Sequence, residues 1–176
     1  GIGRNDFIGS NIQGKTVGII GLGHVGRRMA ELCGTLFGMR VLAYDPYIEA
    51  KDFDERKATS TPLDELLAAS DFVTVHCPRN DETLNFINAS TFKKMKPGAF
   101  FVNTARGGIH DEAALFAALD SGHLGGAGID VWAVEPPSKD HPLLSLNNVL
   151  ASPHTAGVSH ESRHMGATYA GEQLLD

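Results

Sequence analysis

Residues 16–26 read Thr-Val-Gly-Ile-Ile-Gly-Leu-Gly-His-Val-Gly, and this stretch decides the fold. Its first half is an apolar run rich in β-branched residues, typical of a buried strand, and a helical pattern follows over residues 27–37. Between them, glycine stands at Gly21, Gly23 and Gly26, in the G-x-G-x-x-G spacing of a dinucleotide-binding turn. A strand, a glycine turn and a helix in this order predict a site for the phosphates of a nucleotide.

Each glycine has a separate role in such a turn. Gly21 allows the chain to turn sharply, and Gly23 lets the backbone approach a pyrophosphate. Gly26 lets the helix pack close to the strand. The free N–H groups and the positive end of the helix dipole would then face the phosphates.

The second half of the nucleotide signal is Asp45, which follows a predicted strand, Arg40–Tyr44, 19 positions after Gly26. A carboxylate there can accept hydrogen bonds from both hydroxyls of an adenosine ribose. The competing interpretation is a buried packing turn followed by a surface aspartate. A 2′-phosphate about 4 Å from this charge would cost on the order of 4 kcal/mol at an effective dielectric near 20. Residues 46–48 offer no arginine in compensation, so the sequence favours NAD over NADP.

The composition is that of an ordinary globular chain: 176 residues, 42% hydrophobic and 20% charged, enough for one buried core. The net charge of −6 and the lack of a basic run argue against a nucleic-acid surface. No apolar stretch approaches a transmembrane length and no secretory signal opens the sequence, so we expect no membrane association. Two cysteines, Cys33 and Cys77, favour a reducing, cytoplasmic compartment over a disulfide framework.

Strand and helix patterns alternate along the rest of the chain, which predicts an α/β fold with a doubly wound parallel (Rossmann) sheet. Residues 49–57 are charged and are expected to be exposed. Thr61 and Pro62 predict a helix start, as N-cap and first helical residue. The further strands are expected at 71–76, 99–103, 126–131 and 148–152, and the further helices at 62–69, 91–95, 111–120 and 159–175.

Ligands of such sheets bind at the carboxyl ends of the strands, so the residues just past each strand are the candidates for function. One edge of the predicted sheet collects an arginine, two acids and a histidine beside the expected nicotinamide. These candidates are Cys77, Pro78, Arg106 within residues 104–108, Asp130 and Glu135 within residues 130–136, and His154 within residues 153–157.

Hydride chemistry on a hydroxy acid needs a cation for the carboxylate, and Arg106 offers a guanidinium that binds it bidentately. The alternative for Arg106 is a surface arginine in a loop. The base that takes the hydroxyl proton can be His154, which directly follows a strand and a proline, although His76 also ends a strand. An adjacent carboxylate stabilises an imidazolium, and the sequence does not choose between Glu135 and Asp130.

Four motifs follow one another in the chain: Gly-Leu-Gly-His-Val-Gly, Val-Asn-Thr-Ala-Arg-Gly-Gly, Gly-Ile-Asp-Val-Trp-Ala-Val-Glu-Pro-Pro and Ser-Pro-His-Thr-Ala-Gly. In this order they resemble the D-isomer-specific 2-hydroxyacid dehydrogenases, which include phosphoglycerate, lactate and hydroxypyruvate/glyoxylate enzymes. The resemblance covers residues 7–176. It implies that Arg106 binds the substrate carboxylate, that His154 is the acid/base, and that Glu135 is its partner. Related formate dehydrogenases carry glutamine in place of this glutamate, so Glu135 disfavours that branch.

The resemblance also implies a set of contacts with NAD. The backbone of His24 and Val25 would lie against the cofactor, and Asp130 would hold the nicotinamide amide and not partner the histidine. The expected cofactor-binding residues are Gly21, Gly23, His24, Val25, Gly26, Asp45, Cys77, Pro78, Thr104, Ala105, Arg106, Asp130, His154, Ala156 and Gly157.

Members of that family carry a second domain, built from a long N-terminal segment and a C-terminal tail, that closes over the substrate. Neither part is recognisable here, so we expect residues 1–176 to be the NAD-binding domain alone, which binds NADH but reduces 2-oxo acids slowly. The resemblance implies a small 2-hydroxy or 2-oxo acid as substrate and a homodimer formed through this domain. The main alternative is an NAD(H)-sensing, non-enzymatic protein like the corepressors of the same fold, which can retain the same three site residues.

One motif is typical of a different class of protein. Residues 160–164 read His-Glu-Ser-Arg-His and match H-E-x-x-H, the pattern of zinc proteases. Two histidines four positions apart on a helix can share a metal ion. No third ligand is identifiable and a nucleotide-binding fold is the wrong setting, so we expect no metal and interpret these side chains as solvated.

Overall fold

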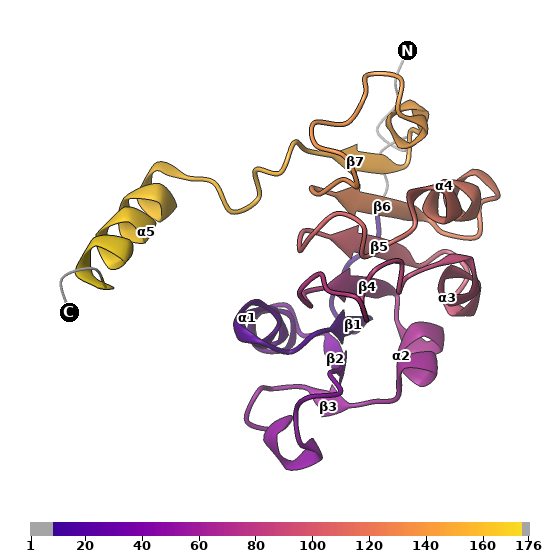
Figure 1. The fold of residues 1–176 in the computed structure, drawn as a ribbon. Helices are drawn as coiled ribbons and strands as arrows, with labels where there is room; N and C mark the ends of the chain where they lie inside the picture. Colours follow the sequence, from indigo (N-terminus) through magenta and orange to yellow (C-terminus); the bar gives the residue numbers. More distant parts are fainter. Residues whose placement is uncertain (1–8, 174–176) are drawn as a thin grey trace.

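In the described part of the chain, seven parallel strands form one sheet in the order β3-β2-β1-β4-β5-β6-β7 (Figure 1). The computed structural model describes residues 9–173. The chain builds outward from β1 to β2 and β3, and then returns to the other side of β1 to add β4, β5, β6 and β7. The strand order therefore reverses between β1 and β4, and ligands of doubly wound sheets bind at such a reversal. The predicted fold class is confirmed.

The strands are β1 (Thr16–Ile20), β2 (Arg40–Tyr44), β3 (Thr59–Ser60), β4 (Phe72–Val75), β5 (Phe100–Asn103), β6 (Gly126–Ile129) and β7 (Val149–Ala151). The helices are α1 (His24–Glu31), α2 (Leu63–Ala69), α3 (Ala89–Lys94), α4 (Glu112–Asp120) and α5 (His160–Gln173). A π-helical turn continues α1, and two 3₁₀ turns lie in connections; these are η2 (Leu32–Leu36), η3 (Ala50–Asp52) and η4 (Pro142–Ser145).

Helices lie on both faces of the sheet, with α1 on one face and α2, α3 and α4 on the other (Figure 1). Side chains alternate across β1, so that Val17 and Ile19 join the core under α1. Ile20 joins the larger core under the other three helices, which includes Leu66 of α2. A Cβ on Gly18 would lie 2.4 Å from the Leu66 Cδ2 atom, so glycine allows α2 to approach the central strand.

Most predicted elements are confirmed to within one or two residues at each end, and the following details differ. The first helix begins at His24, earlier than predicted, and changes to a π-helical turn at Leu32. The N-cap of α2 is Pro62 in an extended conformation, and the Thr61 hydroxyl instead donates to the Thr59 carbonyl. Residues 49–57 are not uniformly exposed, because Phe53 is buried in the core under α1. The short strand β3 was not predicted at all.

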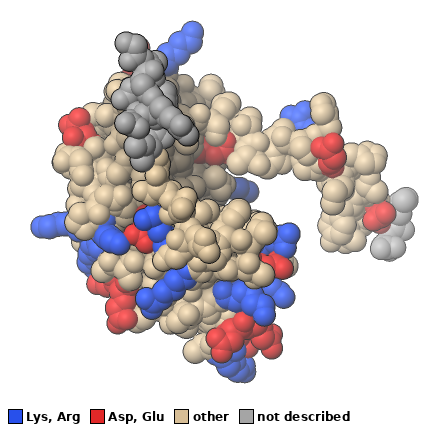
Figure 2. Space-filling view, turned by 180° about the vertical axis from the view of Figure 1, so that it is seen from behind, with Lys and Arg blue, Asp and Glu red and all other residues tan. Residues whose placement is uncertain are grey.

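The helix α5 stands apart from the sheet (Figure 1), and none of its described residues is buried. His160 and His164 are both exposed on it. Among residues 9–173 there is no group of three or more histidine, cysteine, aspartate or glutamate side chains that could hold a metal ion. None of the described helices combines the length and the apolar composition that crossing a membrane requires. Figure 2 shows basic and acidic side chains interspersed on one face of the sheet domain.

Candidate functional site

The glycine turn between β1 and α1 leaves backbone donors uncapped at the start of the helix. Gly21 has a φ of +91°, in the left-handed region that favours glycine. A Cβ on Gly26 would lie 2.1 Å from the Gly21 carbonyl oxygen, so only glycine allows this close approach of helix and turn. Gly23 is the N-cap of α1 and faces open space, and no side chain caps the first N–H groups of the helix. Those donors are available for an anion.

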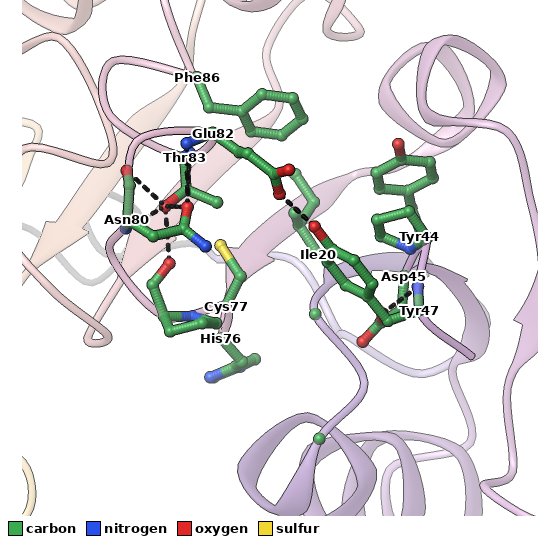
Figure 3. Close-up of a pocket in the computed structure, with 14 residues that line it drawn as sticks. Ile20, Tyr44, Asp45, Tyr47, His76, Cys77, Asn80, Glu82, Thr83 and Phe86 are labelled. Atoms are coloured by element: carbon green, nitrogen blue, oxygen red, sulfur yellow. Dashed lines mark hydrogen bonds between the residues drawn. The ribbon is translucent and has the colours of Figure 1, made fainter.

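A cavity of about 280 Å³ adjoins this turn, between the carboxyl ends of β1, β2 and β4 (Figure 3). Asp45 lines it at the end of β2. One carboxylate oxygen of Asp45 accepts from the Leu22 N–H at 2.8 Å and the other from the Tyr47 N–H at 3.0 Å. Across the mouth of the cavity, the Tyr47 hydroxyl donates to the Glu82 carboxylate. Two backbone N–H groups thus fix the orientation of the Asp45 carboxylate at the end of β2.

A cation that the sequence did not reveal also lies at this turn. The guanidinium of Arg56 donates to the Leu22 carbonyl at 2.9 Å, on the residue whose N–H donates to Asp45. Arg56 reaches the turn through the fold and not through its position in the chain, so residues 46–48, which follow Asp45 directly, give no sign of it.

Three cavities follow one another along the carboxyl edge of the sheet. His76, Cys77 and Pro78 line both the first cavity and a second one of about 500 Å³, which also borders His24, Val25, Thr104 and Ala105. Arg79 and Arg106 line both that second cavity and a third of about 230 Å³. Because neighbouring cavities share lining residues, the three lie side by side from Asp45 to His154, and together they are called the groove.

The third cavity brings together the three residues that the sequence singled out for catalysis. His154, Glu135 and Arg106 all line it. The Nδ1 atom of His154 lies 2.8 Å from one oxygen of Glu135, and the other oxygen accepts from the Trp132 N–H at 3.0 Å. Two hydrogen bonds hold the pKa of Glu135 below its usual value; the one to His154 has the larger effect and the one from the Trp132 N–H the smaller. The sequence left Glu135 and Asp130 open as partners, and the structure places Glu135 beside the imidazole.

Asp130 instead holds the loop that carries His154. Its carboxylate accepts from the Ser152 hydroxyl at 2.6 Å and from the N–H groups of Thr155 and Ala156 at 2.8 and 2.9 Å. Burial opposes ionisation of Asp130, but these hydrogen bonds outweigh it and lower its pKa. His154 itself has a φ of +57°, an uncommon conformation for a residue with a side chain. The Asp130 contacts hold the loop in this strained form, which is typical of functional sites.

The Arg106 side chain is exposed, but its backbone is fixed by hydrogen bonds to the buried side chain of Asn103. The side-chain amide of buried Asn103 donates to the Arg106 carbonyl at 3.1 Å, and its oxygen accepts from the Ala105 N–H at 2.9 Å. The same amide nitrogen lies 2.9 Å from Nδ1 of His110. Burial lowers the pKa of His110 to about 4, so the imidazole is neutral at pH 7 and its Nδ1 accepts from Asn103. Its Nε2 has no hydrogen-bond partner among the described residues.

His76, the other histidine at a strand end, does not join Glu135. Its Nε2 lies 3.1 Å from the Thr74 hydroxyl, and it lines the first and second cavities but not the third. Burial lowers the pKa of His76 to about 4. A neutral imidazole in the wall of these cavities is a poor donor of protons at pH 7.

The sequence did not identify two residues at this site: one that lines the third cavity and one that supports a neighbouring loop. Arg79 follows Pro78 directly, so the rule that residues past a strand line the site would have included it one position further on. Glu112, at the start of α4, accepts from the Ala133 N–H at 2.7 Å and lies 3.2 Å from Nε2 of His141. No pattern along the chain links Glu112 to the loop it supports.

Comparison with known proteins identifies the family to which this chain is similar. The model of the family described as D-isomer specific 2-hydroxyacid dehydrogenase, NAD binding domain, matches residues 2–156. D-3-phosphoglycerate dehydrogenase of Archaeoglobus fulgidus is 46% identical over 160 residues, which are 91% of this chain and 30% of that protein. Glyoxylate reductase of Korarchaeum cryptofilum is 41% identical over 170 residues, which are 96% of this chain and 51% of that protein.

A solved structure shows the same similarity in three dimensions. It is the NAD complexed form of a D-isomer specific 2-hydroxyacid dehydrogenase from Lactobacillus delbrueckii ssp. bulgaricus, with a TM-score of 0.84 and 32% identity. The match covers 99% of this chain and 56% of that one. The chain therefore spans about half, or less, of the length of the proteins it resembles.

Proposed function

This chain belongs to the D-isomer specific 2-hydroxyacid dehydrogenases, as their NAD-binding domain, and from that premise we propose the reaction of the whole protein. The protein transfers hydride between NAD(H) and a small D-2-hydroxy acid or the corresponding 2-oxo acid. The observation that carries this proposal is the 2.8 Å contact between His154 and Glu135 in a cavity that Arg106 also lines.

The groove along the sheet edge suits the cofactor. When bound, NADH supplies the hydride and NAD⁺ accepts it. The N–H groups at the start of α1, at His24 and Val25, would hold the pyrophosphate, and Asp45 the adenosine ribose. Asp130 has three of its four acceptor positions filled by its own loop, which leaves one for the nicotinamide amide. The other proposed contacts are Gly21, Gly23, Gly26, Cys77, Pro78, Thr104, Ala105, Ala156 and Gly157.

In the direction of reduction, each of the three residues has one task. Arg106 holds the carboxylate of the 2-oxo acid with its guanidinium fork and polarises the adjacent carbonyl. Nδ1 of His154 is engaged by Glu135, so Nε2 donates the proton to the carbonyl oxygen as negative charge develops there. Glu135 stabilises the charged imidazolium and fixes the ring orientation.

We also propose that residues 1–176 form one domain of a longer enzyme, because the matched relatives are two to three times as long.

We propose a homodimer formed through this domain. Its support is the edge strand β7 and the nearby loops, where Leu150 is 82% and Val134 is 76% exposed. Sedimentation velocity of the protein and of Leu150→Asp measures this association.

The free thiols of Cys33 and Cys77 support a reducing, cytoplasmic compartment.

The test of function is His154→Ala in the full-length protein, assayed with NADH and a panel of 2-oxo acids. We expect kcat to fall by about 10²–10⁴-fold, the usual contribution of general acid/base catalysis, while the affinity for NADH is unchanged. His160→Ala is the matched control, because His160 lies on α5 outside the groove. Tight NADH binding without reduction of any acid would instead favour the sensor alternative.

A further inference from the structure

The third cavity contains a charge that the proposed mechanism does not use. Two arginines, Arg106 and Arg79, are among the residues that line it, together with Glu135 and His154. A substrate with a single carboxylate needs only one of them. We propose that Arg79 is a second anion-binding residue, and that the substrate is a 2-oxo acid carrying a second negative group, a phosphate or a distal carboxylate. This inference rests on the proposed function.

The backbone of Arg79 is held in place by a hydrogen-bonded turn on the loop after β4. The Thr83 hydroxyl donates to the Pro78 carbonyl at 2.7 Å and accepts from the Asn80 N–H at 2.9 Å. The Asn80 side chain accepts from the N–H groups of Glu82 and Thr83 at 3.1 and 3.0 Å. The residues on both sides of Arg79 are therefore fixed, and its side chain starts from a defined point at the cavity.

The guanidinium of Arg79 lies against the loop that carries Arg106. A Cβ on Gly108 would lie 3.3 Å from Cζ and Nε of Arg79, so the guanidinium packs over the Gly108 backbone. Gly108 has a φ of +76° and comes two positions after Arg106 in the chain. The two arginines thus reach the same cavity from two neighbouring strand ends, those of β4 and β5.

The described part of the chain offers no carboxylate partner to either positive charge. Within residues 9–173, no carboxylate oxygen lies within 4.0 Å of the Arg79 or the Arg106 guanidinium. The acid of the cavity, Glu135, is engaged by His154 and the Trp132 N–H. Two like charges in one cavity repel each other, and an anionic ligand relieves this repulsion. A ligand with two anionic groups pairs with both guanidinium groups, whereas one with a single carboxylate leaves Arg79 unpaired.

Arg79 also borders the second cavity, so the competing role is binding of the cofactor pyrophosphate. The two roles differ in what they predict. If Arg79 binds the pyrophosphate, Arg79→Leu weakens the binding of NADH whatever acid is reduced. If Arg79 binds the substrate, Arg79→Leu changes only the discrimination between acids. The affinity for NADH and the ratio of kcat/KM values therefore separate them.

The experiment measures kcat and KM of the full-length protein for two matched pairs of acids with NADH. Phosphohydroxypyruvate against hydroxypyruvate tests a phosphate, and 2-oxoglutarate against 2-oxovalerate tests a distal carboxylate. We expect at least one pair to favour the doubly charged acid in the native protein. Arg79→Leu should lower that preference about 10- to 100-fold, mainly through KM, as expected for one charge-assisted hydrogen-bonded contact. Arg79→Lys should retain part of it, because the charge remains.

Arg40→Leu is the matched control. It removes the same charge from an exposed position at the start of β2, on the opposite edge of the sheet. An equal preference in the native protein and in Arg79→Leu, or weaker NADH binding with no change in the preference, overturns this inference alone. If no 2-oxo acid is reduced at all, the proposed function fails and this inference fails with it.

Discussion

Gly107 lines the third cavity, and adding one methyl group there tests the geometry of the proposed site. A Cβ there would lie 1.7 Å from the Trp132 carbonyl oxygen, 2.2 Å from its carbon and 2.9 Å from the Ala133 nitrogen. These are backbone atoms and cannot rotate away. In Gly107→Ala, the peptide between Trp132 and Ala133 has to retreat by about 1.7 Å to reach an ordinary contact of 3.4 Å.

Displacing this peptide disturbs the two hydrogen bonds that hold the loop carrying Glu135. The Ala133 N–H donates to Glu112 at 2.7 Å, and the Trp132 N–H donates to Glu135 at 3.0 Å. Inserting a methyl group into a packed site costs about 1–3 kcal/mol of stability. A displacement of about 1 Å in a catalytic group costs on the order of 10²-fold in rate, so we expect a loss of this size in kcat. The affinity for NADH should change little, because the glycine turn and Asp45 lie at the other end of the groove.

The assay uses a reporter that the protein already contains. Trp132 is the only tryptophan in the sequence and is 3% exposed, so its fluorescence reports on this loop. Gly107→Ala should shift the emission to longer wavelengths and lower the free energy of unfolding in urea. The control is Gly128→Ala, where the new Cβ would lie 3.8 Å from the Val102 methyl groups and should stabilise by about 0.4–1 kcal/mol. Unchanged emission and full activity in Gly107→Ala would refute the position assigned to the Trp132 carbonyl.

Two further predictions concern the cofactor and pH. Asp45→Ser removes the charge that disfavours a 2′-phosphate and leaves Arg56 at the same turn, so NADPH should bind about 10- to 100-fold more tightly. Fluorescence titration with NADPH checks this, and an unchanged affinity contradicts it. The pKa of His110 is about 4 in the folded protein and 6.5 as its ordinary value, so below pH 6.5 only the unfolded chain takes up this proton. Stability is therefore lost as pH falls from 6.5 toward 4, by about 2 kcal/mol for His110 between pH 7 and 5. In urea unfolding, His110→Gln should flatten this dependence, and an equal slope in both proteins would count against a buried neutral imidazole.

The sheet was predictable because its signals are local. The glycine turn identifies β1 and α1, and alternating strands and helices specify a parallel sheet by their order alone. The strand β3 has only two residues, too few for any periodicity. Phe53 lies in a segment whose charges predict exposure, but a single aromatic ring folds back under α1. These exceptions are tertiary effects, in which the packing of distant elements overrides the local pattern.

The candidate catalytic residues were predictable for a different reason. In a parallel sheet, the residues that follow each strand meet at one edge, so position along the chain implies proximity in space. The choice of Glu135 over Asp130 depends on something else, the path of the loop after β6. There Asp130 turns toward the residue 154 loop, while Glu135 returns to the Trp132 N–H. Spacing alone does not encode that path, and it was the family resemblance that named Glu135, the residue that contacts His154.

The three proposed catalytic side chains share one structural device. Each lies on an exposed loop, and each loop is fixed by a polar group at or just beyond the end of a strand. Asn103 holds the Arg106 backbone, Asp130 holds the segment around His154, and the Trp132 N–H holds Glu135 directly. Asn103 and Asp130 are 0% and 3% exposed, so water does not compete for their hydrogen bonds. Side chains that remain open to a substrate can therefore be positioned by the rigid part of the sheet, which is what an acid/base pair and a carboxylate anchor need to act on one small molecule.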